Sequence, residues 1–211
     1  MLTLLLLSAT LRATPAAARA SLEARVPEAS RAAVAAGLTA WGNAVASGAI
    51  RRTDVLTVID YSRPSTEPRL FVIDVPAGRV KFAERVAHGR GSGENVTERF
   101  SNKFGSRMTS LGVFRAADTY DGHHGISLHL DGLEPGFNDH ARDRTIVMHG
   151  ADYVNDQIIA AQGRLGRSWG CPAVRPEIAQ KLFEAIQGGS LVVAYYPDAD
   201  WLARSEYLKA P

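Results

Sequence analysis

The apolar residues near the start of the chain follow a helical spacing. Val34, Leu38, Trp41 and Val45 are separated by four, three and four residues, so they would share one face of an α-helix. Pro27 precedes this run, as proline commonly does near the first turn of a helix, and a Ser-Gly pair follows it. The pattern predicts an amphipathic helix that ends at this pair.

From residue 54 onward the apolar residues form short β-rich runs instead. Turn residues, among them Pro and Gly, separate the runs. In one of them Ile126, Leu128 and Leu130 alternate with polar residues, as in a half-buried strand. We predict strands over residues 55–59, 70–75, 79–86, 111–114, 123–131, 145–148 and 190–196, the first three as a series of hairpins.

Two other segments complete the predicted arrangement. Residues 89–110 are polar and rich in Gly and Ser, which predicts a long loop. Pro176 begins a helical pattern that ends before a Gly-Gly pair. Strands outnumber helices and we find no repeat or linker, so the fold class is mainly β (α+β) in a single domain.

Composition narrows the class of protein. The chain has 211 residues, enough for one well-buried domain and too few for two ordinary ones. Hydrophobic residues make up 45% and charged residues 22%, as is typical of a folded domain. The net charge of +2 is small and comes from scattered residues, so we expect no nucleic acid partner.

The N-terminus has the pattern of a secretory signal. Leu2 to Leu7 is almost entirely apolar, and an Ala-rich stretch with small-residue cleavage sites follows. No Lys or Arg precedes the apolar run, so a leader without a targeting role is the alternative. The run is too short to cross a bilayer, which takes about 20 apolar residues. We predict a signal peptide over residues 1–20, a secreted or periplasmic location and no transmembrane segment in the mature protein.

The only cysteine and a histidine upstream of it carry the strongest chemical signal. Cys171 lies between Gly170 and Pro172, and His149 stands 22 residues earlier at the end of a predicted strand. If folding brings the two together, the imidazole can take the thiol proton and leave a nucleophilic thiolate. A turn at Gly170 can aim backbone N–H groups at a developing oxyanion. This pattern predicts a cysteine acyltransferase or peptidase; an inert buried cysteine is the alternative.

Two motifs resemble the catalytic domain of the L,D-transpeptidases, the YkuD-type enzymes that cross-link bacterial peptidoglycan. They are His149-Gly150 and Ser168-Trp169-Gly170-Cys171, which are similar to the family's strand-end His-Gly and Ser-His-Gly-Cys. Trp169 replaces the second histidine of the family motif, which indicates a divergent branch. Residues 86–93 and 127–138 are also similar, and the resemblance covers about residues 50–197.

The resemblance implies a β-sandwich-like fold with an N-terminal helix and a helix after the cysteine, and a reaction without metal or cofactor. Cys171 would be the nucleophile, His149 the base, and Gly150 the source of the carbonyl that orients the base. The substrate would be a peptidoglycan tetrapeptide stem, which loses its terminal D-alanine and passes its acyl group to an amine or to water. The expected divisions are a signal peptide (1–20), a helical extension (21–49), a catalytic domain (50–197) and a C-terminal tail (198–211).

Several residues are candidates for supporting roles. Ser168, like Gly150 and Gly170, would support catalysis, although a turn-forming role explains a serine equally well. Trp169, His129 and Arg167 are candidates for substrate binding. Core packing is the alternative for the indole and solvation for the arginine.

A histidine-rich stretch raises the question of a metal. Strand alternation puts His123 and His129 on one face and His124 on the other, so three converging ligands are not expected. No His-Glu-x-x-His pattern is present either. We therefore predict no metal site. His88 and His140 are interpreted as loop residues.

Two other functions remain open at this point. A cysteine endopeptidase or amidase of the cell wall would use the same pair of residues. Papain-like enzymes place Cys before His, whereas here His149 precedes Cys171, so chain order disfavours that fold. A catalytically inactive peptidoglycan-binding module is the third candidate, because Trp169 departs from the motif.

Overall fold

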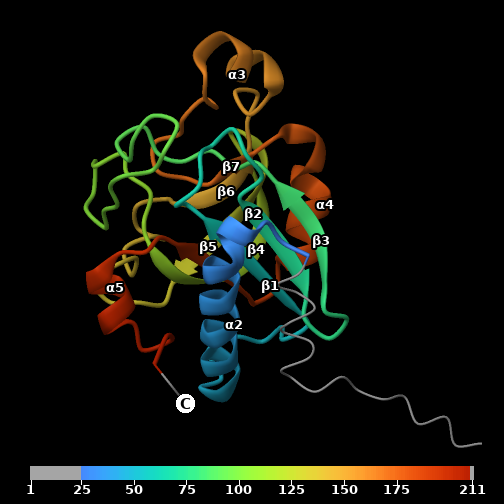
Figure 1. Cartoon of the computed structure of the whole chain (residues 1–211), viewed down its shortest axis with the longest axis vertical. Helices are drawn as coiled ribbons and strands as arrows, with labels where there is room; N and C mark the ends of the chain where they lie inside the picture. The colour runs from blue at the N-terminus through green and yellow to red at the C-terminus, as the bar shows by residue number, and fades with distance from the viewer. Residues whose placement is uncertain (1–24, 210–211) are drawn as a thin grey trace, which may run out of the picture.

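Eight strands form one curved sheet in the computed structural model, which describes residues 25–209 (Figure 1). The predicted signal peptide lies outside these residues. The strands follow the order β3-β2-β1-β8-β4-β5-β6-β7. Their bounds are β1 Val55–Asp60, β2 Leu70–Asp74, β3 Arg79–Glu84, β4 Gly112–Gly122, β5 Gly125–Gly132, β6 Val147–Gly150, β7 Ala173–Val174 and β8 Ser190–Tyr195.

The sheet is almost closed. Ala173 in β7, one edge strand, forms an antiparallel bridge with Ala87, just after β3 at the other edge. The predicted hairpin series is confirmed, because β2 is antiparallel to both β1 and β3. The sequence pattern did not predict that β8 returns between β1 and β4, parallel to the first and antiparallel to the second. The fold is therefore mainly β, as expected.

The helices are the 3₁₀ turn η1 Glu28–Ser30, α2 Arg31–Ala46, α3 Asp156–Gln162, α4 Pro176–Ile186 and α5 Ala199–Arg204. The longest helix is α2, and the others are shorter. In Figure 1, α2 lies along the sheet, α5 and the C-terminus lie toward one end, and α3 projects from the other. None of the helices among residues 25–209 is both long and apolar enough to cross a membrane.

Helix α2 packs on the sheet through a different face from the one predicted. Leu38 and Trp41 are only partly buried, and Val45 is 38% exposed. The small residues of the helix point inward because it lies very close to β1: a Cβ on Gly37 would lie 2.5 Å from Val58 Cγ2. The buried positions are Ala33, Val34, Gly37, Ala40 and Ala44. The N-terminal helix thus shares a core with the sheet.

Helix α4 follows the sequence prediction. It begins at Pro176, and its apolar side chains Ile178, Leu182, Phe183 and Ile186 are buried. They pack in the main core with inward side chains of the sheet, including Leu128 and Met148. Contacts with β6 and β5 place this helix directly behind the strand that carries His149.

The segment expected to be a C-terminal tail contains a packed helix. Trp201 in α5 is fully buried, and its Nε1–H donates to Glu134 Oε2 at 2.8 Å. The Val113 N–H and the Ser205 hydroxyl donate to the same carboxylate. Burial raises the pKa of Glu134, and these donors oppose that shift. A helix of six residues is too short for its periodicity to show in the sequence.

Candidate active site

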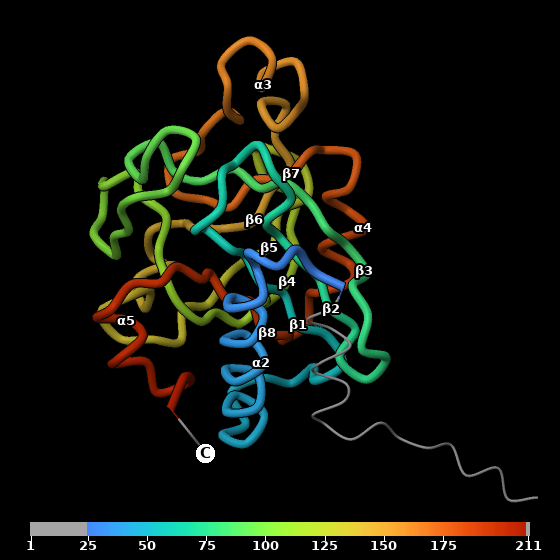
Figure 2. Tube along the Cα trace, viewed as in Figure 1, coloured from blue at the N-terminus to red at the C-terminus, as the bar shows by residue number. Residues whose placement is uncertain are grey.

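A cleft of about 580 Å³ brings together the residues singled out by the sequence motifs. Its lining includes Cys171, His149, Ser168, Trp169 and Arg167. The β4–β5 hairpin and Thr145, two residues before β6, supply further parts of the lining. The long segment between β3 and β4 runs beside the loop that ends at Cys171 (Figure 2), and Gly89 forms a bridge with Ser168 there.

His149 is held in a single ring orientation. Its cross-strand partner in β5 is Ser127, which also lines the cleft. Its Nδ1 lies 2.9 Å from the Gly150 carbonyl oxygen. A carbonyl can only accept, so Nδ1 carries the proton and Nε2 is left as the basic nitrogen. Burial lowers the pKa of His149; the Gly150 hydrogen bond opposes this shift and the charge of His124 adds to it. The ring is therefore neutral at neutral pH, as a base must be.

Gly150 is needed for close packing as well as for its carbonyl. A Cβ at this position would lie 3.2 Å from Pro176 Cα and 3.3 Å from Ala179 Cβ. The end of β6 thus rests directly on the first turn of α4. This contact fixes the peptide whose oxygen orients His149.

The loop before Cys171 is folded tightly by Ser168 and Gly170. The Gly170 N–H donates to Ser168 Oγ at 3.1 Å, and the Ser168 hydroxyl donates to the Cys171 carbonyl oxygen at 2.6 Å. Gly170 has φ +136°, and a Cβ there would lie 2.8 Å from Ile146 Cδ1. The Gly170 N–H is already bonded to Ser168 and is not free to meet an oxyanion. The N–H of Cys171 itself is therefore the candidate oxyanion donor.

Burial keeps the Cys171 thiol protonated in the resting site. Its Sγ donates to the Thr145 carbonyl oxygen at 3.7 Å. Burial raises the pKa of Cys171, and this outweighs the backbone hydrogen bond from Val147 and the positive charge of Arg144, which both favour the thiolate. A buried sulfur loses hydration that would stabilise its charge. The pair is thus a neutral thiol and a neutral imidazole.

This protonation state is testable through thiol alkylation. We expect the rate of iodoacetamide alkylation of Cys171 to rise with pH through an inflection above the ordinary thiol value of about 8.5. The reason is that burial raises the pKa of the thiol, so the sulfur ionises only at higher pH. Because the protein has one cysteine, the measurement needs no other change to the chain. An inflection below neutral pH would instead indicate a preformed thiolate-imidazolium pair.

Arg144 is a residue near the sulfur that sequence reasoning missed. Its guanidinium donates to the carbonyl oxygens of Ser101 and Met108 and to the hydroxyls of Ser106 and Ser110. It therefore ties the 101–110 loop to the start of β6. Burial lowers the pKa of Arg144, although the guanidinium stays charged. Nothing in the sequence distinguishes this arginine from a solvated one.

A buried polar network supports the cysteine loop from behind. Thr109 Oγ1 donates to the Gly170 carbonyl oxygen at 3.1 Å and accepts from the Gly89 N–H at 2.9 Å. The neighbouring His88, interpreted as a loop residue, has 1% of its surface exposed. Its Nδ1 accepts from Nη2 of the buried Arg69 at 2.8 Å. Burial, aided by the Arg69 charge, lowers the pKa of His88 to about 4, so it stays neutral.

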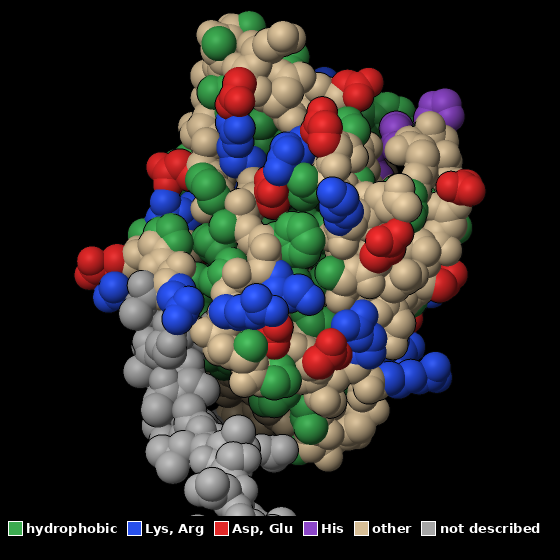
Figure 3. All heavy atoms as spheres, turned by 90° about the vertical axis from the view of Figure 1, so that its right-hand side faces the viewer, with side chains coloured by type: hydrophobic (Ala, Val, Ile, Leu, Met, Phe, Trp, Pro, Cys, Tyr) green, Lys and Arg blue, Asp and Glu red, His purple; other side chains and the backbone are tan. Residues whose placement is uncertain are grey.

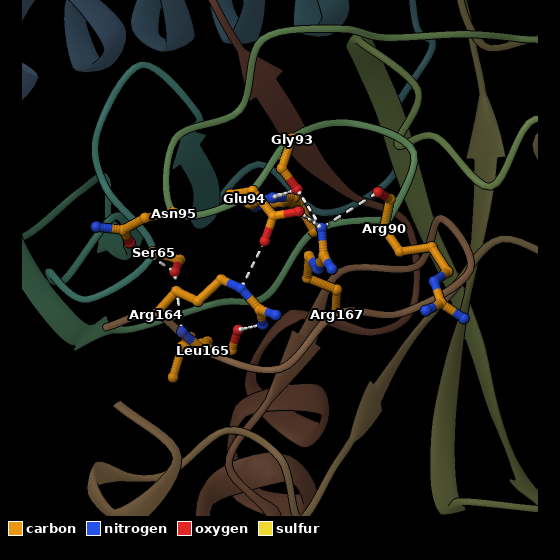
Figure 4. Close-up of polar contacts among 9 residues, drawn as sticks. Ser65, Arg90, Gly93, Glu94, Asn95, Arg164, Leu165 and Arg167 are labelled. Carbon is orange, nitrogen blue, oxygen red and sulfur yellow. Dashed lines mark hydrogen bonds and ion pairs between the residues drawn. The ribbon is translucent and has the colours of Figure 1, made fainter. Parts of the chain in front are cut away.

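Arg167 is committed to a structural ion pair. Figure 4 shows its guanidinium pointing at the 93–94 segment, where Nη1 donates to the Gly93 carbonyl oxygen at 2.9 Å and to Glu94 Oε1 at 2.5 Å. Arg164 donates to the other oxygen of Glu94 at 2.8 Å. The carboxylate therefore joins two loops that are far apart in sequence. The charge of Arg167 is already matched, which leaves less of it for a substrate carboxylate.

Trp169 and His129 occupy different positions relative to the cleft. Trp169 lines it with 69% of its surface exposed, and the Arg107 guanidinium lies 4.8 Å from the centre of its ring. His129 is not among the residues that line the cleft. Its Nδ1 is 3.3 Å from Asp118 Oδ2, and its ring stacks on Tyr120, which does line the cleft, at 4.3 Å.

The two histidines at the tip of the hairpin are not on a strand. His123 and His124 form the turn between Gly122, the last residue of β4, and Gly125, the first residue of β5, and these two glycines pair with each other. The alternation used to separate them therefore does not apply. The His124 ring stacks on His149 with centroids 4.5 Å apart. Within residues 25–209, no group of three or more His, Cys, Asp or Glu side chains is arranged to hold a metal ion.

Charge is mixed on the surface. On the face shown in Figure 3, basic and acidic side chains are interspersed. Arg–Asp and Arg–Glu pairs account for many of them, such as Arg175 with Glu84 at 2.9 Å.

The sequence of this chain matches the model of a known protein family. The model of the L,D-transpeptidase catalytic domain matches residues 26–195, so the chain belongs to that family. The match includes α2, the sheet and the motifs at His149 and Cys171. No curated protein sequence matches the chain.

Solved structures give a more distant likeness. An L,D-transpeptidase from Mycobacterium smegmatis is 16% identical with a TM-score of 0.41, over 68% of this chain and 59% of that one. LdtMt1 in complex with imipenem is 16% identical with a TM-score of 0.37, over 60% and 53%. The helical cell shape determining protein Pgp2 from Campylobacter jejuni is 13% identical with a TM-score of 0.41, over 69% and 44%. The chain thus spans about half the length of the structures it matches.

Proposed function

We propose that this chain is a cysteine-dependent L,D-transpeptidase, or L,D-carboxypeptidase, that acts on peptidoglycan tetrapeptide stems through a thioester at Cys171. One observation carries the proposal. The only thiol and an imidazole with its basic nitrogen left free line the same cleft, at the positions of the family motifs. Membership of the L,D-transpeptidase family supports a role in peptidoglycan chemistry.

In the first half-reaction, His149 Nε2 takes the thiol proton while the sulfur bonds to the carbonyl carbon between the third stem residue and D-alanine. The Cys171 N–H lies next to the sulfur and is the donor best placed to meet the resulting oxyanion. The carbon–nitrogen bond then breaks, and the leaving nitrogen takes the proton from His149. D-Alanine departs and a thioester remains.

In the second half-reaction an amine of a neighbouring stem attacks the thioester carbonyl. Its proton passes to His149, the carbon–sulfur bond breaks, and the proton returns to Cys171. The product is a cross-linked pair of stems. If water attacks instead, the product is a tripeptide stem and the enzyme acts as a carboxypeptidase.

The neutral pair in the resting site fits a general-base mechanism. The thiol must turn from the Thr145 carbonyl toward His149 Nε2 before it can be deprotonated. Arg144 adds a positive charge that favours the sulfur anion as it forms. Proton removal and attack can therefore occur together in the bound complex.

Trp169 contributes to substrate binding in this proposal. Its exposed ring at the cleft rim offers apolar surface to a bound stem. We expect Trp169→Ala to raise KM roughly three- to tenfold with kcat almost unchanged, because a rim contact is made equally in the ground and transition states. Phe104→Ala is the matched control: that ring is 64% exposed but does not line the cleft. Equal KM effects in both variants, or a fall in kcat alone, would contradict this role.

The location follows from the proposed substrate. L,D-transpeptidases act on the cell wall, so an envelope or periplasmic location fits the family. The predicted leader over residues 1–20 would direct export. Fractionation of cells that produce the full chain, with antibody detection and N-terminal sequencing of the mature form, tests both points.

The direct test is incubation of the purified protein with disaccharide-tetrapeptide, followed by mass spectrometry of the products. We expect free D-alanine together with a cross-linked dimer or a tripeptide. Cleavage at another bond of the stem would favour the endopeptidase or amidase alternative. Binding without any product would favour the inactive module.

A further inference from the structure

The base of the proposed reaction is covered by a second imidazole that no motif includes. His124, in the turn of the β4–β5 hairpin, stacks on the ring of His149 in β6. The ring centroids are 4.5 Å apart and the planes are inclined by 21°. Both rings line the cleft that holds Cys171. A residue in an exposed turn thus covers one face of a buried catalytic candidate.

We propose that His124 is a positioning residue that keeps His149 unprotonated and fixes its ring in the plane needed to take the Cys171 proton. The inference rests on the proposed function only in treating His149 as the base. His124 acts through His149 and transfers no proton itself in the reaction.

The stacked geometry excludes direct proton transfer between the two rings. Imidazole N–H bonds and nitrogen lone pairs lie in the plane of the ring. With the planes nearly parallel, the ring nitrogens of His124 and His149 do not point at each other. The two rings therefore touch through their faces. This contact can position His149 but cannot pass a proton to it.

Stacking acts on His149 in two ways. The covering ring removes water from one face of the imidazole, and a desolvated imidazole is harder to protonate. When His124 itself is protonated, its charge lies close to His149 and opposes a second positive charge. Both effects act in the same direction, so the base stays available in mildly acidic conditions, where an ordinary histidine would be lost.

The contact also holds the ring in place. The Gly150 carbonyl fixes the Nδ1 edge of His149 but leaves its outer face open toward the cleft. His124 closes that face. The turn is short and flanked by Gly122 and Gly125, the second of which has φ +73°, a conformation that suits the tight hairpin.

Other titratable or charged groups surround the stack and must be considered with it. His123 on the same turn lies edge-on to His124 at 5.2 Å. On the facing elements, the cleft is lined by Tyr120 of β4, by Tyr153 after β6, and by Arg167 and Cys171 before β7. Of these, His123 is the one that resembles His124 chemically, which makes it the natural control.

The experiment is a titration of the histidine ring signals by NMR in the ligand-free full chain, with His149 assigned through a His149→Asn variant. In the wild type we expect His149 to titrate below the usual value of about 6.5. In His124→Ala it should titrate about half a pH unit higher. His124→Phe keeps a ring over His149 without the charge and should give an intermediate value. His123→Ala should leave the His149 titration unchanged.

Turnover gives a second readout. Because protonated His149 cannot act as base, the acidic limb of the kcat/KM profile in His124→Ala should move by the same amount. That shift lowers activity up to about threefold more on the acidic limb than on the plateau at about pH 8, where only the loss of ring positioning remains. A role in the fold alone would lower activity by one factor at every pH and would not move the limb.

Two results would overturn the inference: a His149 titration in His124→Ala that superposes on the wild type, or an equal shift in His123→Ala. The titration needs no substrate, so its outcome is independent of the peptidoglycan assays. A shifted titration in a protein that never releases D-alanine would refute the proposed function and leave the positioning role of His124 intact.

Discussion

In Cys171→Ala, D-alanine release and cross-linking are expected to fall to the level of a reaction without enzyme. The chain contains one cysteine, so no other thiol can replace it. Covalent catalysis loses its whole first step when the nucleophile is removed, and what remains is substrate binding. Activity is measured by mass spectrometry of D-alanine and cross-linked stems.

The same variant should still fold and bind substrate. Cys171 is half-buried and small, so alanine removes one sulfur atom and the thiol contact with Thr145. The loop keeps the Ser168 and Gly170 bonds, which involve no part of the thiol. Cys171→Ser is the second variant, because it keeps size and hydrogen bonding and lacks only the nucleophilic sulfur. Retained turnover in the alanine variant would remove Cys171 from the mechanism.

His149→Asn is expected to lower kcat/KM roughly 10²- to 10⁴-fold at neutral pH, the usual contribution of a general base. Asparagine keeps a polar side chain at the end of β6 but has no basic nitrogen. Without a base, attack depends on spontaneous ionisation of a thiol whose pKa is raised by burial. The residual rate should therefore climb with pH through the alkaline range and lose the acidic limb.

His140→Ala is the matched control for that variant. His140 is half-exposed, beside Asp143 and Phe104, and does not line the cleft. Its activity and pH profile should superpose on the wild type. A His149→Asn enzyme that keeps its rate within about tenfold, or that keeps the acidic limb, would show that another group is the base.

The parts of this structure that follow from the sequence are those encoded locally. The alternation at Ile126, Leu128 and Leu130 requires a strand, and the apolar face of α4 is periodic over three turns. The presence of His149 and Cys171 in one cleft was predictable because each lies in a short motif of adjacent residues. Such features depend on a few neighbouring residues, which a single sequence displays directly.

Other features depend on contacts between residues distant in sequence. Arg167 reaches Glu94, 73 positions away, and Arg144 reaches Ser110, 34 positions away. The sequence around each arginine does not distinguish it from an arginine exposed to solvent. The buried face of α2 was misassigned because the prediction followed the spacing of large apolar residues. The close approach of α2 to β1 instead requires small residues on the buried face.

His124 was missed for a third reason, the position of a turn. Reading residues 123–131 as one strand assigned His123 and His124 to opposite faces. The hairpin instead turns at these two residues, and Gly122 pairs with Gly125. A glycine in the left-handed conformation directly after two turn residues, as Gly125 is, is typical of one class of hairpin, so the sequence contained the information. Applying it would have placed His124 beside the cleft.

Capture of the covalent intermediate tests the central claim most directly. Wild-type protein is mixed with tetrapeptide stem, quenched in acid within the first turnover and measured by intact-protein mass spectrometry with peptide mapping. The account predicts a mass increase equal to the substrate less D-alanine, located on Cys171 and absent from Cys171→Ala. Product formation without any adduct, or an adduct that still contains the terminal D-alanine, would contradict it.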